Sequence, residues 1–522
     1  VLKMQIITTA IRTTIFFIII NLRVCKLVKK NDFDFQNIMK LTHLKKVFYF
    51  CPMGRQKRRE PVLIENIEII DTANKGKSVA KHEGRAIFVQ GGVPGDICDI
   101  TVFKKQKKFW EARIEKIHTY SDRRTEPKCE HFDTCGGCKW QNMKYESQLA
   151  FKQNEVLNNL KRIGGIELPQ HCEIIGSEHE YFYRNKMEFT FSNKRWLTTE
   201  EVQSEAEIED KDALGFHVPG MFDKVINLNN CHLQKEPSNT IRLAVKQFAD
   251  ENSLSYFDLR NQKGLLRNLL IRTSSTNDLM VLVQFFEDDK KNINLLMEHI
   301  KISFPEITSL LYVINQKGND TIYDQEVVCY NGKDHIMEKM DGLYFKIGAK
   351  SFFQTNSDQA KVLYQKTKEL AKITENDLVY DLYTGTGTIA QYVATSAKKV
   401  VGIDSVEEGI KAAYENAERN KIENCIFYTG DIKEIFTDEF IAKNGAPDII
   451  ITDPPRDGMH KQVVEQILKI GAKRVVYISC NSATQARDIS LMDELYKVIH
   501  IQPIDMFPQT HHVENIVVLE KK

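Results

Sequence analysis

The sequence lacks an apolar run long enough to cross a lipid bilayer. A spanning helix takes about 20 consecutive apolar residues, whereas the apolar run from Ile15 to Ile20 is flanked by Arg12 on one side and by Asn21 and Arg23 on the other. A basic region and a short apolar run would also suit a secretory signal, but no Ala-x-Ala-like cleavage pattern follows Ile20, which disfavours that interpretation. We therefore expect a cytoplasmic protein with no membrane partner.

The chain also lacks an excess of charge of either sign. Its 72 Lys and Arg residues nearly balance 71 Asp and Glu residues, which leaves a net charge of +1. This balance neither requires nor excludes a polyanionic partner, so the positions of the basic residues matter more than their number. They gather early, around Met53–Arg59. We expect residues 1–52 to be a non-native or disordered extension, with the functional chain beginning at Met53.

With 522 residues the chain has room for about three domains of ~150 residues each. From Pro61 to Ile117, short β-rich runs alternate with Gly-rich turns. This pattern predicts a small all-β barrel of OB-like type, which we assign to residues 59–118. It carries cations beside aromatic rings, at Lys104, Lys105, Lys107, Lys108, Phe109 and Trp110. Such a surface binds single-stranded nucleic acid, although solvated lysines at a strand edge also simply prevent aggregation.

The rest of the chain divides into two further regions. Residues 119–343 mix helices, such as 145–163, with strands, such as 186–192, and are typical of an α+β domain whose strand order the sequence does not give. From residue 344 to 522, apolar strands alternate with helices. This alternation predicts a doubly wound, mostly parallel sheet of Rossmann-like type, and the fold class is multidomain α/β.

A glycine-rich loop in the last region indicates a cofactor site. Asp381–Gly387 reads DLYTGTG, closes a predicted strand and opens a helix, so that backbone can approach a ligand there. The next strand ends in Asp404, which suits ribose hydroxyls, and two further strands end at Asp431 and Asp453. The third glycine of a dinucleotide site is replaced by Ala390. A cofactor with a positive centre and no phosphate fits better, and S-adenosylmethionine is such a cofactor.

Two residues near the C-terminus are candidates for catalysis. Cys480 follows an apolar strand and precedes Asn481; a free cysteine in such a place is usually a small buried hydrophobe, but polar neighbours also suit a nucleophile. Glu514 comes just before the last predicted strand, IVVLE, either as a solvated strand end or as a base. The preceding His511 and His512 could suggest a metal, but adjacent side chains of an extended chain point to opposite faces.

Five motifs occur in order along the chain: Ser351–Asn356, Asp381–Gly387, Asp453–Gly458, Ser479–Asn481 and His512–Glu514. Together they resemble the RNA uracil-5-methyltransferase family of the RumA/TrmA type, over essentially Pro61 to the C-terminus. The resemblance implies a class I methyltransferase domain in which Cys480 adds to C6 of uracil and Glu514 removes the C5 proton. It further implies that S-adenosylmethionine is bound by Gln354, Tyr383, Asp404 and Asp453. At Asp404 the family often has Glu instead.

Three cysteines, Cys129, Cys135 and Cys138, have the spacing C-x5-C-x2-C. With a fourth thiolate they could hold zinc or an iron–sulfur cluster, and the spacing does not decide between these. The family resemblance implies a [4Fe-4S] cluster with Cys231 as the fourth ligand. Cys172 is the competing fourth ligand.

The resemblance also implies a partner. The barrel resembles the TRAM domain, an RNA-binding module, and a TRAM domain together with the cysteine cluster resembles the family's ribosomal RNA enzymes rather than its tRNA-specific form. We therefore expect a monomer that methylates 23S ribosomal RNA, with tRNA as the alternative substrate. An iron–sulfur RNA-binding protein without catalysis, or a metal-dependent scaffold, would leave Cys480, Glu514 and Gln354 unexplained.

Overall fold

The computed structural model describes residues 62–169, 173–204 and 210–522. The expected N-terminal extension, residues 1–52, and the alternative cluster ligand Cys172 therefore lie outside the described residues. Within the described ranges, no helix combines the length and the apolar character that crossing a bilayer requires.

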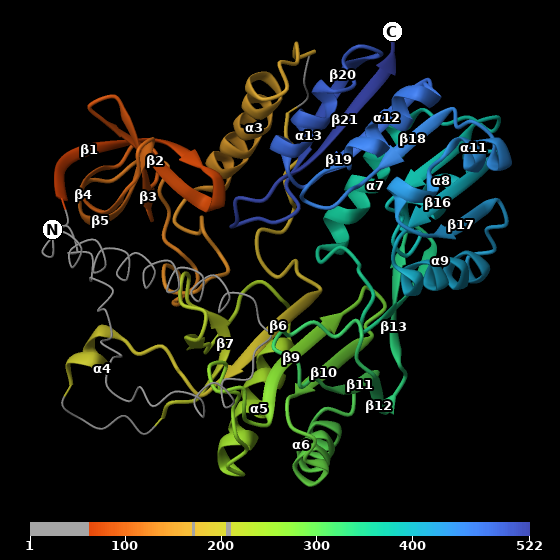
Figure 1. Cartoon of the computed structure of the whole chain (residues 1–522). Helices are drawn as coiled ribbons and strands as arrows, with labels where there is room; N and C mark the ends of the chain where they lie inside the picture. The colour runs from red at the N-terminus through yellow and green to blue at the C-terminus, as the bar shows by residue number, and fades with distance from the viewer. Residues whose placement is uncertain (1–61, 170–172, 205–209) are drawn as a thin grey trace, which may run out of the picture. The chain divides into compact units, whose positions relative to one another are not determined.

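A closed five-stranded barrel opens the described chain, with the neighbour order β1-β2-β3-β5-β4 (Figure 1). Only β3 and β5 are parallel neighbours among these strands. Alternate side chains, including Ile69, Ile87 and Ile100, are fully buried in the barrel core. This confirms the predicted all-β barrel. Its elements are β1 (Val62–Ala73), η1 (Asn74–Gly76), β2 (Lys77–His82), β3 (Arg85–Gln90), β4 (Ile97–Lys105) and β5 (Phe109–Thr119).

The central region forms a mixed sheet with the order β12-β11-β10-β9-β6-β7-β8 in the described residues. The helices α5 and α6 bury Ile241, Val245 and Leu296 in one core with Phe189 and Val281 of the sheet. The elements are α3 (Tyr145–Arg162), β6 (Lys186–Ser192), α4 (Thr199–Gln203), β7 (Ala213–His217), β8 (Val225–Asn227), α5 (Ser238–Glu251), β9 (Leu266–Thr273), β10 (Leu279–Phe285), α6 (Lys290–Ser303), β11 (Ser309–Ile314) and β12 (Val327–Gly332).

The C-terminal region forms a second large sheet, with the order β17-β16-β15-β18-β19-β21-β20 among its described strands. The first five strands are parallel, as predicted, and β21 enters antiparallel between β19 and β20. The elements are α7 (Ser357–Ala371), β15 (Leu378–Leu382), α8 (Thr388–Ala394), β16 (Lys399–Asp404), α9 (Glu407–Arg419), β17 (Cys425–Thr429), α10 (Ile432–Ile435), α11 (Asp438–Asn444), β18 (Ile449–Thr452), α12 (Lys461–Ile470), β19 (Arg474–Ser479), α13 (Ser482–Ser490), β20 (Tyr496–Ile504) and β21 (Glu514–Lys521).

Hydrophobic cores lie on both faces of this sheet. Because successive side chains of a strand point to opposite faces, Val379 belongs to the core that holds α7 and α8, whereas Tyr380 belongs to the core that holds α12 and α13. The second core also contains Val156 and Leu160 of α3. Figure 1 shows α3 beside α13, and the two helices are in contact. A helix of the predicted central region thus covers the C-terminal sheet.

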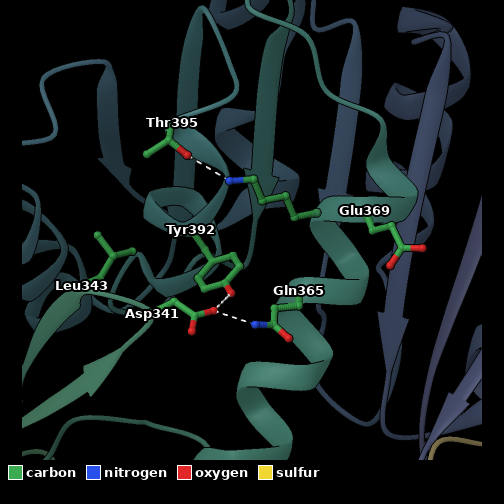
Figure 2. Close-up of a pocket in the computed structure, with 7 residues that line it drawn as sticks. Asp341, Leu343, Gln365, Glu369, Tyr392 and Thr395 are labelled. Atoms are coloured by element: carbon green, nitrogen blue, oxygen red, sulfur yellow. Dashed lines mark hydrogen bonds between the residues drawn. The ribbon is translucent and has the colours of Figure 1, made fainter.

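A hairpin of β13 (His335–Met340) and β14 (Leu343–Gly348) crosses the expected boundary at residue 344. At its turn, the carboxylate of Asp341 accepts hydrogen bonds from Gln365 of α7, at 2.8 Å, and from the hydroxyl of Tyr392 of α8 (Figure 2). These residues line a polar cavity of about 470 Å³, which contains none of the predicted site residues. The hairpin is therefore fastened to the helices of the C-terminal sheet.

Candidate active site

The parallel register brings three of the predicted residues to one edge of the C-terminal sheet. Leu382 of β15 pairs with Ile403 of β16 and with Thr452 of β18. The residues that follow each of these positions are Tyr383, Asp404 and Asp453, and they therefore lie at the same level along the sheet. Ligands of open α/β sheets bind at this carboxyl edge of the strands.

The antiparallel insertion of β21 brings the two candidate catalytic residues to the same edge. Ser479, the last residue of β19, pairs with Asn515 of β21. Cys480 directly follows β19 and Glu514 precedes Asn515, so continuing the antiparallel register places the thiol residue opposite the carboxylate residue. Had β21 run parallel to β19, its first residue would lie at the other edge of the sheet.

A cavity of about 700 Å³ occupies this edge, within the range of about 300–1,000 Å³ that is usual for small-molecule sites. All six residues predicted for catalysis and cofactor binding line it: Gln354, Tyr383, Asp404, Asp453, Cys480 and Glu514. Gln354 comes from the loop between β14 and α7, where its backbone carbonyl accepts a hydrogen bond of 2.9 Å from the Asn185 side chain. The strands and this loop thus converge on one site.

The glycine-rich loop has the tight geometry that its sequence predicts. Gly385 and Gly387 have φ angles of 55° and 74°, and Tyr383 also lies in the left-handed region, at 66°. A Cβ atom on Gly387 would lie 2.9 Å from the Cβ of Ala413, so a larger residue does not fit. The Asp404 carboxylate accepts a hydrogen bond of 2.9 Å from the backbone N–H of Gly385. Asp404 therefore holds the glycine-rich loop against the end of β16.

Buried carboxyl groups give the site its electrostatic character. Burial raises the pKa of Asp381 and of Asp453 to about 7 each. Burial, and next the neighbouring Asp453, raise the pKa of Glu514 well above its ordinary value, while Arg456 partly opposes this. Because each ionised carboxylate disfavours the ionisation of the next, a bound cation would relieve their repulsion. The residues present therefore fit a ligand with ribose hydroxyls and a positive sulfonium centre.

Cys480 lies half-buried beside a cation. Burial, and next the negative Glu514, raise the pKa of its thiol to about 11, whereas the Arg456 guanidinium, which hydrogen-bonds the thiol, lowers it. The backbone carbonyl of Arg456 accepts hydrogen bonds from the side chains of Asn481, at 2.9 Å, and Thr484, at 3.0 Å. The Asp453–Gly458 loop is thereby tied to the start of α13, next to the thiol.

The expectation for the histidine pair is wrong. The ring centroids of His511 and His512 are 4.1 Å apart, because the two residues precede β21 and do not form part of an extended strand. His512 lines the cavity, and burial lowers its pKa to about 3, which keeps the ring neutral. Its Nδ1 atom lies 3.4 Å from a guanidinium nitrogen of Arg456.

The structure also separates one predicted acidic strand end from the others. Asp431 is not among the residues that line the cavity; its carboxylate caps α10 and pairs with Lys433 at 2.8 Å. Conversely, Phe352 and Phe507 line the cavity from loops. Loop aromatics carry no periodic signal in the sequence, so strand-end reasoning did not identify them as cavity residues.

The four predicted cluster ligands line a different cavity, together with Phe132, Phe216 and Leu228: they are Cys129, Cys135, Cys138 and Cys231. The backbone N–H of Gly137 donates a hydrogen bond of 3.4 Å to the Cys135 sulfur. In the described parts of the chain, no three His, Cys, Asp or Glu side chains converge in a way that would hold a single metal ion. A set of four thiols in an apolar surrounding is nevertheless the donor set that iron–sulfur clusters use.

Comparisons with known proteins agree with this site. Residues 316–522 match the family model described as tRNA (Uracil-5-)-methyltransferase. An "Uncharacterized RNA methyltransferase" of Bacteroides thetaiotaomicron is 53% identical over 451 residues, which are 86% of this chain and 99% of the relative. A protein of the same description from Porphyromonas gingivalis is 51% identical over 460 residues, which are 87% of this chain and 99% of the relative.

A solved structure is similar over nearly the same length. It is the Pyrococcus abyssi tRNA (uracil-54, C5)-methyltransferase in complex with S-adenosyl-L-homocysteine, with a TM-score of 0.67 and 27% identity, covering 87% of this chain and 100% of that one. Fold and site thus define an S-adenosylmethionine-dependent RNA methyltransferase. The chain belongs to the RNA uracil-5-methyltransferase family.

Proposed function

We propose that the protein methylates C5 of a uridine in 23S ribosomal RNA by covalent catalysis, with Cys480 as nucleophile and Glu514 as base. The observation that carries this proposal is the register of β19 and β21, which sets Cys480 opposite Glu514 on the wall of one cavity. A thiol and a carboxylate that face the same bound base can act on adjacent ring atoms.

The reaction needs both groups because C5 of uracil is a poor nucleophile. The Cys480 thiolate adds to C6, and the resulting enolate carries negative charge to C5. C5 takes the methyl group that S-adenosylmethionine supplies from its sulfonium, and S-adenosylhomocysteine leaves. Glu514 then removes the C5 proton, the C5–C6 double bond re-forms and the C6–S bond breaks, which restores the thiolate. The uridine must leave its stack to reach the cavity.

The pKa shift of Glu514 supports its role as the base. The raised pKa of Glu514 makes its carboxylate a stronger base, and a base is most effective when its pKa lies near the working pH. Arg456, by hydrogen-bonding Cys480, opposes the effect of burial on the thiol and favours the thiolate. Arg456 is therefore the neighbour that favours the thiolate, against the burial and the Glu514 carboxylate that raise the thiol pKa to about 11.

We assign cofactor binding to Gln354, Tyr383, Asp404 and Asp453. Asp404 ends β16, and its two carboxylate oxygens accept hydrogen bonds from the backbone N–H groups of Gly385, at 2.9 Å, and Val406, at 2.8 Å. Each oxygen can accept one further hydrogen bond, from a ribose hydroxyl. Asp453 lies between that loop and Cys480 in the order of the strands, next to where the sulfonium and the reacting carbon would meet. Its negative charge favours the sulfonium.

RNA binding is assigned to the barrel. The ring of Trp110 has Arg85 at 4.7 Å and Lys105 at 4.6 Å from its centroid, a combination of stacking surface and positive charge that suits single-stranded RNA. A tRNA substrate is the second candidate, because both the matching family model and the similar Pyrococcus abyssi enzyme are described as acting on tRNA.

Release of the C5 proton tests this function directly. We expect the protein, given S-adenosylmethionine and unmodified 23S ribosomal RNA labelled with tritium at C5 of uridine, to release one tritium for each methyl group transferred. Unmodified tRNA with the same label serves as the competing substrate. Methyl transfer without tritium release would contradict attack at C5, and transfer to tRNA alone would replace the ribosomal substrate.

We also propose that Cys129, Cys135, Cys138 and Cys231 hold a [4Fe-4S] cluster. Cys231 lines the same cavity as the other three cysteines, and its backbone N–H donates a hydrogen bond of 2.9 Å to the Asn239 side chain, which holds its segment in place. When bound, the cluster would join the loop of the first three cysteines to the segment after β8. It would thus serve a structural or RNA-positioning role.

The identity of the fourth cluster ligand can be tested by the visible absorbance of the protein. Cys231→Ala is expected to lose most of the visible absorbance of the anaerobically purified or reconstituted protein, because three thiolates leave one iron without its ligand. Cys172→Ala and the exposed Cys329→Ala serve as controls and should keep the absorbance and the iron content. If Cys172→Ala loses the chromophore and Cys231→Ala keeps it, the assignment of the fourth ligand is wrong.

A further inference from the structure

The loop of residues 505–513, which joins β20 to β21, begins and ends beside the candidate base. Ile504, the last residue of β20, pairs with Glu514, the first residue of β21. Phe507 and His512 of this loop line the cavity. Any displacement of the loop therefore acts on the position of Glu514.

A fully buried ion pair joins the 505–513 loop to α3. The ammonium group of Lys152, on α3, lies 2.6 Å from the Asp505 carboxylate, and both side chains are 0% exposed. Lys152 also donates a hydrogen bond of 3.1 Å to the Phe507 carbonyl. The hydroxyl of Tyr145, two turns earlier on the same face of α3, donates to the other Asp505 oxygen at 2.9 Å.

A second contact of α3 fixes the middle of the loop. The side-chain amide of Gln148 donates to the Gln509 side-chain oxygen at 3.0 Å, and the Gln509 backbone N–H donates back to Gln148 at 3.0 Å. The Gln509 carbonyl accepts from the backbone of Lys139, the residue after Cys138, at 2.8 Å. On the other side, Gln359 of α7 donates to the Asp505 carbonyl at 2.8 Å.

Stability alone does not explain the ion pair. Two charges removed from water lose so much hydration that well-packed apolar residues of similar size often stabilise a fold as well or better. A buried pair does fix one geometry, because each charge must keep its partner. Here that geometry is the path of the 505–513 loop, which leads directly into Glu514.

We propose that Lys152 and Asp505 are positioning residues that hold the 505–513 loop so that Glu514 is aimed at the C5 proton. This inference rests on the proposed role of Glu514 as the base. Cys480 and the assigned cofactor residues lie on segments outside this loop, whereas Glu514 directly follows it, so we expect proton removal to be the step that depends most on the position of the loop. Loosening the loop therefore slows proton removal and leaves methylated RNA attached to Cys480.

The test removes both charges together. In Lys152→Met/Asp505→Asn no lone charge remains buried, so the double variant is expected to fold, while the Phe507 carbonyl loses its donor. We expect tritium release to fall about tenfold or more, since a misplacement of 1 Å can cost about a hundredfold. Because proton removal slows by this factor, the fraction of protein in a covalent RNA adduct should rise several-fold. The affinity for S-adenosylmethionine should stay unchanged.

Two variants accompany this measurement. Lys161→Met removes an exposed lysine of the same helix and should leave turnover and adduct as in the wild type. Tyr145→Phe removes only the hydroxyl that donates to Asp505, and should shift both quantities in the same direction by a smaller factor. This variant tests the proposal even if the double variant folds poorly.

The proposal is overturned if folded variants show wild-type turnover and adduct, or if adduct and turnover fall together. Glu514→Gln is assayed alongside, so that a failure of the positioning role can be distinguished from a failure of the proposed function. If Glu514→Gln accumulates adduct and the Lys152 and Tyr145 variants do not, only the positioning role is wrong. If Glu514→Gln forms none, the role of Glu514 as base fails as well.

Discussion

Glu514→Gln is expected to trap RNA on the protein as a covalent adduct that survives denaturation. Glutamine has the shape of the glutamate side chain but cannot accept the C5 proton, so the reaction stops after methyl transfer, before the bond from Cys480 to C6 can break. Turnover should fall by about 10²–10⁴, the usual contribution of a general base. A denaturing gel with labelled RNA and S-adenosylmethionine shows the adduct as a slowly migrating band.

The matched control is Glu494→Gln, a change of the same chemistry at an exposed residue between α13 and β20. It should turn over at the wild-type rate without accumulating adduct. A Glu514→Gln protein that is folded, binds both substrates and forms no adduct would show that proton removal at C5 does not depend on this carboxylate.

Cys480→Ala is expected to abolish both the adduct and methyl transfer. Without the thiolate, C5 has no enolate character and cannot attack the sulfonium methyl group, so the loss should reach the several orders of magnitude, about 10⁴ or more, that removal of a catalytic nucleophile costs. Because Cys480 lies on the cavity wall and outside the main cores, the change should leave the folded state intact. Methyl transfer and adduct are measured in parallel with circular dichroism.

Cys329→Ala, at an exposed cysteine of β12, serves as its control and should behave as the wild type. In the double variant Cys480→Ala/Glu514→Gln the adduct should be absent, because the covalent bond to C6 of uracil is formed by the Cys480 sulfur. If Cys480→Ala still methylates RNA, Cys480 is not the nucleophile and only lines the cavity.

The edge of the C-terminal sheet could be predicted from the sequence because parallel strands share their carboxyl ends. Asp404 and Asp453 each follow an apolar run, and the alternation of strands with helices is enough to place them at one edge. Glu514 is harder, since it begins its strand. It lies at this edge only because β21 runs antiparallel, a feature that β-rich residues alone do not encode.

Other parts of the fold depend on contacts between residues far apart in the chain. The pairing of β6 with β9, in which Lys186 lies opposite Arg272, sets the order of the central sheet, and no local pattern in the sequence reports it. The ion pair of Lys152 with Asp505 joins residues separated by 353 positions. The prediction for His511 and His512 is wrong for a local reason. Adjacent side chains point to opposite faces only in an extended strand, and these two residues precede β21 and are not part of it.

The position of α3 sets a limit on how this enzyme can be divided. The family model begins at residue 316, yet Val156 and Leu160 fill the core of the sheet that this segment builds. A fragment cut at that boundary would expose an apolar face to water and would leave Asp505 without its ion-pair partner Lys152. The C-terminal region is therefore not an independent unit, and chimeras that exchange the N-terminal barrel must keep α3 with the C-terminal sheet.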